Sequence, residues 1–237
     1  MVVAADGGGE RHRRDSILAA VPRRLVLLLV LALAGCGASA KPAPTKSVAT
    51  PTPDKAGCPQ APKPPAQDES LPKPHTRLQR GKTYVATVKT NCGSFQITLD
   101  PKRAPITGGS FLYLARHHFF DGLTFHRIHP GFVIQGGDPH GDGSGGPGYT
   151  VVEPPPRNLR YTRGVVAMAK TASDPSGASG SQFFVVTAPD AGLPPQYALL
   201  GRVTGGQATV SRIDALGNAQ EQPTQVVLIR SIRVRVS

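Results

Sequence analysis

From residue 81 onward, apolar and polar residues alternate with a period of two in a series of short runs. Tyr84–Val88 and Phe95–Leu99 flank the turn-forming triplet Asn91-Cys92-Gly93, which predicts a β-hairpin. Six further runs of this kind lie at 124–128, 132–135, 165–169, 182–186, 197–203 and 226–236. Eight short strands separated by Gly- and Pro-rich turns are typical of a closed barrel or a sandwich.

Two segments have helical spacing instead. The first runs from Pro105 to Arg116, although Gly108 and Gly109 weaken it by about 1 kcal/mol each relative to Ala. The second spans about 208–216, where apolar residues recur every third position and Gly217 ends the pattern. The sequence therefore predicts a mainly β domain with two α-helices over residues 81–237.

The N-terminus has the pattern of an export signal. The apolar run Leu25–Ala34 follows two arginines, and it is too short to span about 30 Å of hydrocarbon. It ends in Leu33-Ala34-Gly35-Cys36, which resembles a bacterial lipobox, so we expect a signal peptide at 1–35 and a diacylglycerol-modified Cys36. An ordinary cleaved signal and an uncleaved anchor are the alternatives. Lipidation predicts a location on the extracytoplasmic face of the cell membrane.

Residues 36–80 form a second region of distinct composition. Ten prolines lie among Ala, Lys, Thr and Ser, and such a segment buries too little apolar surface to fold alone. We therefore predict an extended, disordered tether. If Cys36 carries lipid, Cys58 and Cys92 are left as a pair in an oxidising compartment, which leads to the hypothesis of a disulfide between them.

The formal net charge of +12 raises the possibility of nucleic-acid binding. The positive residues are spread over all three regions without a long basic run, and there is no Trp for base stacking. We therefore predict no nucleic-acid partner. A basic surface suits anionic lipid headgroups or wall polymers better.

Four motifs within the strand-rich region resemble those of the cyclophilin family. The residues 125–138 (FHRIHPGFVIQGGD) and 180–187 (GSQFFVVT) are similar to its signature, 164–169 (GVVAMA) to an intervening strand, and 141–149 (GDGSGGPGY) to a glycine loop. Order and spacing agree over about residues 82–236. The resemblance implies a closed eight-stranded antiparallel barrel capped by two helices. It also implies a peptidyl-prolyl cis/trans isomerase that acts on proline-containing polypeptides without a metal or cofactor.

The chemistry of that reaction accounts for the residue types. Rotation about an X–Pro bond crosses a barrier of about 18–20 kcal/mol, because amide resonance is lost as the bond twists. A fixed donor aimed at the pyramidal prolyl nitrogen stabilises the twisted state over both planar isomers. Arg127 is the candidate donor, since guanidinium keeps its charge, and Gln135 would hold the substrate carbonyl and orient Arg127.

The resemblance also assigns the remaining substrate contacts. The expected apolar pocket for the proline ring comprises Phe132, Val133, Phe184, Leu193 and Tyr197, with main-chain contacts at Ala169 and Lys170. Lys170 stands where the family often has Asn, and Tyr197 where animal members carry His. At position 170 we therefore expect the main-chain contact to persist and the side-chain contact to differ from that of the family.

The histidines suggest two other kinds of chemistry. His126 lies beside Arg127, but isomerisation transfers no proton, so we expect a structural, hydrogen-bonded histidine there. A zinc cluster would draw on His117, His118, His126, His129 and His140, which lack an acidic or Cys partner at ligand spacing. The sequence therefore predicts no metal site.

The leading functional hypothesis is a monomeric isomerase that assists the folding of exported proteins. A non-catalytic module that binds proline segments or acts as a chaperone at the cell envelope is the alternative. A surface adhesin that binds anionic polymers through its basic charge is a third hypothesis.

Overall fold

The structure, a computed structural model, describes residues 57–237. The predicted signal peptide, Cys36 and the first part of the predicted tether lie outside the described residues. None of the helices within residues 57–237 has the length and apolar character needed to cross a membrane.

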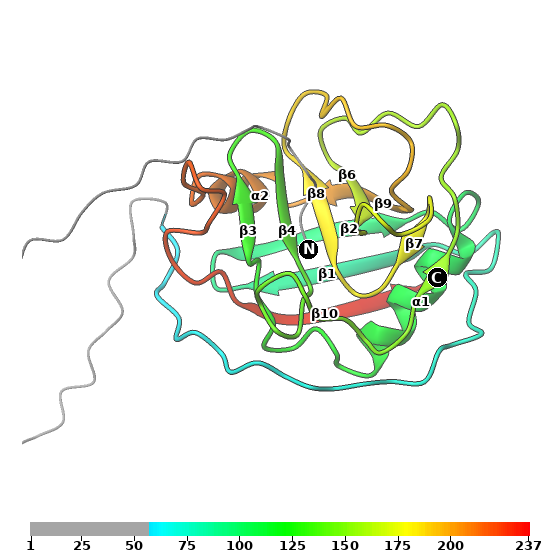
Figure 1. Ribbon diagram of the computed structural model, residues 1–237, viewed down its shortest axis with the longest axis horizontal. Coiled ribbons are helices and arrows are strands. Elements are labelled where there is room, and N and C mark those ends of the chain that lie inside the picture. The colour runs from blue at the N-terminus through cyan, green and yellow to red at the C-terminus, as the bar shows by residue number, and fades with distance from the viewer. Residues whose placement is uncertain (1–56) are drawn as a thin grey trace, which may run out of the picture. The chain divides into compact units, whose positions relative to one another are not determined.

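One antiparallel sheet of eight strands dominates the fold (Figure 1). Its spatial order is β10-β1-β2-β9-β6-β8-β4-β3. In chain order the strands are β1 (Tyr84–Thr90), β2 (Gly93–Leu99), β3 (Arg127–His129), β4 (Val133–Gly136), β6 (Val165–Met168), β8 (Phe183–Val186), β9 (Leu199–Gly205) and β10 (Ile229–Val236). The eight predicted strands are all present, and the hairpin turns at Asn91-Cys92 as expected.

The predicted closed barrel is wrong, because the sheet curls into a half-barrel. The edge strands β10 and β3 do not pair with each other. The segment before β3 does approach the start of β10: an isolated bridge joins Thr124 to Leu228, and the amides of Gly122, Phe125 and Ile229 donate to the carbonyls of Ile229, Val227 and Leu123, respectively. With three residues, β3 is too short to continue this contact as a ladder. Period-two alternation predicts strands, but it does not predict whether the two edges meet.

A second sheet and two helices complete the fold. The two-residue strands β5 (Val151–Val152) and β7 (Ala178–Ser179) pair with each other, and they are too short to give an alternating pattern. Helix α1 (Pro105–Arg116) has the predicted limits, and α2 (Gln207–Asp214) begins one residue and ends two residues before its predicted limits. The first turn of α1 is capped by Glu153, whose carboxylate accepts hydrogen bonds from the Ile106 and Thr107 amides.

Residues 57–80, here called the N-terminal strap, lack helix and strand but follow the surface of the domain (Figure 1). A disulfide joins Cys58 to Cys92 at the β1–β2 turn. The amides of Gln67, Leu71 and Leu78 donate to the carbonyls of Pro139, Pro147 and Pro105, respectively. Contacts with the domain therefore begin well before residue 81, in a segment expected to be disordered.

Glycines in α1 make room for the strap. A Cβ at Gly109 would lie 2.1 Å from the carbonyl oxygen of Thr76, and one at Gly108 would lie 2.4 Å from the Leu78 side chain. Leu78 is 4% exposed in the core. The two glycines that weaken the helix in isolation thus permit it to pack against the strap.

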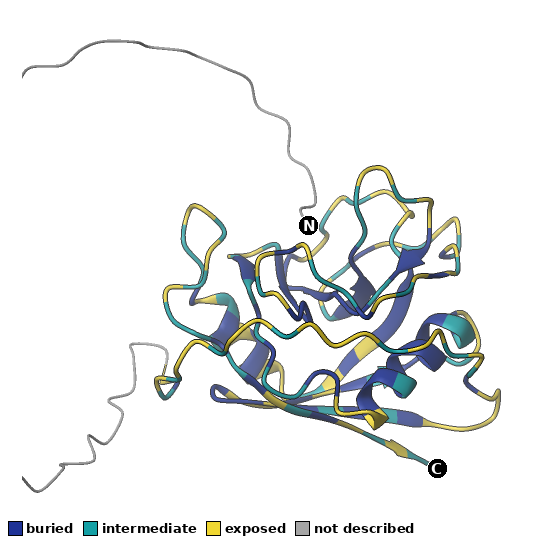
Figure 2. Cartoon of the chain, turned by 60° about the horizontal axis from the view of Figure 1, so that its bottom comes forward, coloured by how far each residue is buried: buried dark blue, intermediate teal, exposed yellow. Residues whose placement is uncertain are grey.

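The main core lies within the curl of the sheet, where buried residues gather in the strands and in α1 (Figure 2). Its largest members are the rings of Phe95, Phe111, Phe119, Phe120, Phe125 and Phe183. Phe183 contacts three other rings edge-on, with centroids 5.7 to 6.0 Å apart. A second, smaller apolar cluster surrounds Phe184.

Candidate active site

The register of the sheet brings the candidate catalytic residues into one row. Arg127 on β3 lies opposite Gln135 on β4, and Gln135 lies opposite Phe184 on β8. Phe184 in turn lies opposite Ala167 on β6. Because successive side chains of a strand point to opposite faces, these residues share one face. The neighbouring row, Ile128, Ile134, Val185 and Val166, belongs to the main core on the other face.

Arg127 is held by hydrogen bonds at two atoms. Its side chain is largely buried, Nη1 donates to Gln135 Oε1 at 3.3 Å, and Nε donates to Glu221 Oε2 at 2.6 Å. Gln135 Nε2 donates onward to Gln182 Oε1 at 3.0 Å. Gln182 Nε2 donates to the carbonyls of Gly143 and Gly145 in the glycine loop. A continuous polar network therefore links the guanidinium to the loop on the far side of the site.

The predicted apolar pocket residues lie together on the same face. The second apolar cluster contains Phe132, Val133, Phe184, Leu193 and Tyr197, and also Ala169, which was predicted as a main-chain contact. The rings of Phe184 and Tyr197 meet edge-on with centroids 5.5 Å apart. The structure thus places an apolar surface on the same face of the sheet as the guanidinium of Arg127.

Tyr161 supports this cluster and was missed by the sequence analysis. Its ring is fully buried, its hydroxyl donates to the Tyr197 carbonyl at 2.6 Å, and it accepts from the Tyr197 amide at 3.0 Å. Burial raises the pKa of Tyr161, so the hydroxyl stays protonated and keeps both bonds. The residue lies outside the recognisable motifs, and no local signal in the sequence identifies it.

Lys170 lies at the rim of the cluster and not within it. Its Nζ donates to the carbonyls of Thr171 and Asp174, and it lies 5.8 Å from the centre of the Tyr197 ring. The ammonium group thus holds its own loop and makes a cation–π contact with a pocket residue.

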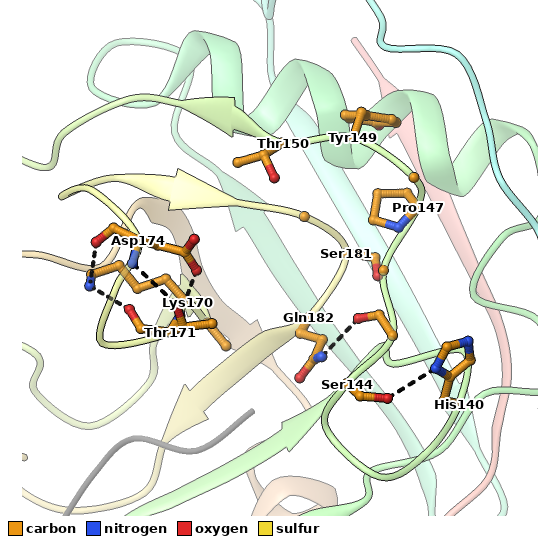
Figure 3. Close-up of a pocket in the computed structure, with 15 residues that line it drawn as sticks. His140, Ser144, Pro147, Tyr149, Thr150, Lys170, Thr171, Asp174, Ser181 and Gln182 are labelled. Carbon is orange, nitrogen blue, oxygen red and sulfur yellow. Dashed lines mark hydrogen bonds between the residues drawn. The ribbon is translucent and has the colours of Figure 1, made fainter.

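A pocket of about 410 Å³ adjoins this face (Figure 3). One wall is the glycine loop from Ser144 to Thr150, and the others come from 169–171, Asp174 and 180–182. It meets the candidate site at Ala169, Lys170 and Gln182, while Arg127 and Phe132 are not among its lining residues. The glycine loop therefore forms the rim of a hollow that extends the site.

Glu221 and His129 are two further residues that the sequence analysis did not assign to the site. Glu221 Oε1 lies 2.7 Å from His129 Nδ1, and the His129 ring contacts Phe132 at a centroid distance of 5.0 Å. Partial burial pushes the pKa of Glu221 up, but the hydrogen bond and charge of Arg127, together with His129, hold it below its usual value. At neutral pH Glu221 is therefore an anion next to Arg127.

His126 is separate from this network. Within residues 57–237, neither of its buried ring nitrogens has a hydrogen-bond partner. Burial lowers the pKa of His126 to about 4, so the ring is neutral at physiological pH. The hydrogen-bonded role expected for His126 is therefore wrong, because burial holds the ring neutral without a partner among the described residues.

The five histidines considered for a metal site do not gather in one place. Of the described residues, one group has potential ligand atoms within 4.8 Å of one another, namely Asp138, His140 and Asp142. The Asp138 carboxylate accepts hydrogen bonds from the amides of His140, Asp142 and Gly143. It therefore fixes the start of the glycine loop that borders the pocket.

Comparisons with known proteins agree with this geometry. A family model described as cyclophilin type peptidyl-prolyl cis-trans isomerase/CLD matches residues 85–234. Peptidyl-prolyl cis-trans isomerase B of Bacillus subtilis is 45% identical over 112 residues, which cover 47% of this chain and 76% of that protein. The protein of the same name from Streptomyces anulatus is 36% identical over 169 residues, covering 63% of this chain and 95% of that protein.

A solved structure is also similar. It is a cyclophilin type peptidyl-prolyl cis-trans isomerase of Cryptosporidium parvum, determined in the presence of the dipeptide Ala-Pro. The two structures superpose with a TM-score of 0.58 at 29% sequence identity, over 64% of this chain and 98% of that one.

Proposed function

The chain belongs to the cyclophilin-type peptidyl-prolyl cis-trans isomerase family and has its isomerase activity, and from this premise we propose that Arg127 is the catalytic donor. The main support is the row formed by Arg127, Gln135 and Phe184 on one face of the sheet. It puts a permanent cation next to an apolar cluster, which is the pairing that a twisted prolyl bond requires.

The mechanism follows from the change in the prolyl nitrogen. In the planar isomers its lone pair is delocalised, and in the twisted state the lone pair is free to accept a hydrogen bond. A guanidinium N–H directed at that atom binds the twisted state more tightly than either isomer, and this difference lowers the barrier. Gln135 holds Nη1 of Arg127 and so limits its motion. The substrate undergoes no covalent change.

The substrate is a proline-containing segment of polypeptide. The Cryptosporidium parvum relative was solved in the presence of Ala-Pro, and the apolar cluster around Phe184 provides a surface for a proline ring in this chain. Phe132, Leu193 and Tyr197 are among the partly buried residues that pack against that cluster, so a ligand can reach them.

The cellular role that we propose is the folding of exported proteins, by a monomer anchored through lipid at Cys36. The disulfide between Cys58 and Cys92 supports an oxidising location. Prolyl isomerisation takes tens of seconds without a catalyst, so it limits folding outside the cytoplasm as it does inside. Cys36→Ala should release the protein from the membrane fraction, and unchanged partitioning would contradict the lipid anchor.

The catalytic assignment is tested by NMR exchange on a proline peptide, with wild type and Arg127→Ala. We expect the variant to lose activity by about 10²- to 10³-fold, as happens when one fixed donor to a transition state is removed. Arg230→Ala, which removes an exposed arginine on β10, serves as the control and should retain full activity. Full activity in Arg127→Ala would show that the donor lies elsewhere.

A further inference from the structure

The loop that follows α2, residues 217–223, is folded back onto the edge strand β3 (Figure 1, orange-red). The Ile128 amide donates to the Glu221 carbonyl at 2.8 Å. The side-chain oxygen of Asn218 accepts hydrogen bonds from the amides of Gln220 and Gln222, which closes the turn. A Cβ at Gly217 would lie 2.5 Å from the Ile128 carbonyl oxygen, so glycine permits this close approach.

Glu221 has an unusual backbone conformation at the tip of this loop. Its φ is +61°, in the left-handed region that a side chain with a Cβ seldom adopts. Such a conformation is unfavourable and persists where surrounding contacts determine it, commonly at functional sites. Glycine would relieve the unfavourable backbone, but glycine has no carboxylate.

The carboxylate of Glu221 reaches two side chains on the same face of β3. Oε2 accepts from Arg127 Nε, and Oε1 lies beside Nδ1 of His129, two residues along the strand. His129 in turn packs against Phe132. The Glu221 carboxylate therefore contacts Arg127 directly, and the His129 ring connects it to Phe132 of the apolar cluster.

We propose that Glu221 is a positioning residue for Arg127 in this isomerase, a role that rests on the proposed function of Arg127. A guanidinium held at Nε by Glu221 and at Nη1 by Gln135 cannot rotate in its plane, and neither contact uses Nη2. The remaining N–H groups then keep a fixed direction toward the substrate. A fixed direction is what makes a donor more effective in the transition state than in the ground state.

The orienting contact of Glu221 favours catalysis, whereas its negative charge disfavours it. A carboxylate beside Arg127 reduces the positive potential that the prolyl nitrogen meets, which by itself disfavours catalysis. An amide oxygen can still accept from Arg127 Nε, but a neutral acceptor holds the guanidinium less strongly than a carboxylate does. Orientation and charge thus predict changes of opposite sign when the carboxylate is replaced by an amide. The experiment therefore decides between them.

The test compares wild type, Glu221→Gln and Gln220→Ala, the last being an exposed residue of the same loop. NMR exchange of a bound proline peptide gives the isomerisation rate, and titration of the same peptide gives its Kd. We expect Glu221→Gln to slow bound-state exchange about tenfold with less than a twofold change in Kd. Gln220→Ala should match wild type. An unchanged or increased rate in Glu221→Gln overturns the proposal.

A spectroscopic readout separates positioning from folding. The Arg127 Nε–H, assigned by its disappearance in Arg127→Lys, should be protected from exchange and shifted downfield in wild type, and both the protection and the shift should decrease in Glu221→Gln. Dispersed amide resonances in the variant would establish that it is folded. If wild type proved inactive, the proposed function would fail while this resonance still reported on the contact. An active wild type whose Nε–H does not change in Glu221→Gln refutes the positioning role alone.

Discussion

The two faces of the strands β3, β4, β8 and β6 differ in what holds their side chains. On the inner face, Ile128, Ile134, Val185 and Val166 join a large core of aliphatic and phenyl groups. On the outer face, the next residue of each strand belongs either to the polar network of Arg127 and Gln135 or to the smaller cluster around Phe184. Adjacent residues of one chain segment thus have unlike roles.

The difference is one between non-directional and directional interactions. Burial of apolar surface stabilises the inner face, and many neighbours share each contact. The outer face depends on particular atoms, such as Arg127 Nε on Glu221, and it includes a residue with an unfavourable backbone conformation. Substitutions on the inner face should therefore change stability, and those on the outer face should change catalysis.

Phe183 and Phe184 give the sharpest test of this comparison, because they are adjacent and point to opposite faces. Phe183→Ala leaves a cavity among three other phenyl rings, and we expect it to lower the free energy of unfolding by about 3–5 kcal/mol. Denaturant unfolding measures the loss, and exchange NMR on the folded protein should show nearly wild-type activity. A strong loss of activity per folded molecule would mean that the two faces are not independent.

The disulfide links the N-terminal strap to the main core on the inner face, since Cys58 and Cys92 both belong to that core. Replacing both cysteines by serine should lower the free energy of unfolding by about 2–4 kcal/mol, mainly because the unfolded chain gains freedom. Thermal unfolding with and without reductant checks this. The double-serine variant should no longer respond to reductant, and its activity should stay within twofold of wild type.

In the chain, His126 lies between Phe125 of the core and Arg127 of the site. Within the described residues its ring nitrogens form no hydrogen bond. Its pKa is about 4 in the folded protein against 6.5 ordinarily, so between these values the unfolded chain binds a proton that the folded one does not. Stability is therefore lost as the pH falls through this window, by about 2 kcal/mol between pH 7 and pH 5.

Denaturant unfolding at both pH values measures that loss, and His126→Phe removes the titrating group. The variant should lose less stability than wild type over the same interval. An equal loss in both proteins would assign the pH dependence to other groups.

Arg127→Lys tests the directional character of the outer face with the charge retained. A lysine ammonium carries its donors on a single nitrogen and not on a rigid plane, so the separate contacts of Nε with Glu221 and of Nη1 with Gln135 are not reproduced. We expect the rate of exchange to fall about 10- to 100-fold, equivalent to about 1.4–2.7 kcal/mol, with a smaller change in the melting temperature. Retention of full activity would show that charge alone is sufficient.

Much of the fold could be predicted because its signals are local. Alternation along each strand located the eight strands of the main sheet, and spacing located both helices. The motif around Arg127, Phe132 and Gln135 identified positions that the sheet then brings onto one face. Side-chain direction within a strand depends only on whether a position is odd or even, so a correct strand assignment also predicts the face.

The tertiary structure alone decided the contacts between segments that lie far apart in the chain. Glu221 meets Arg127 across 94 residues, and Tyr161 meets Tyr197 across 36. The half-barrel likewise depends on how closely two distant edge strands approach each other. The position of the strap depends on the packing of Leu78 against Gly108 in α1. No local pattern encodes such pairs, because each is selected by the geometry of the whole sheet and its loops.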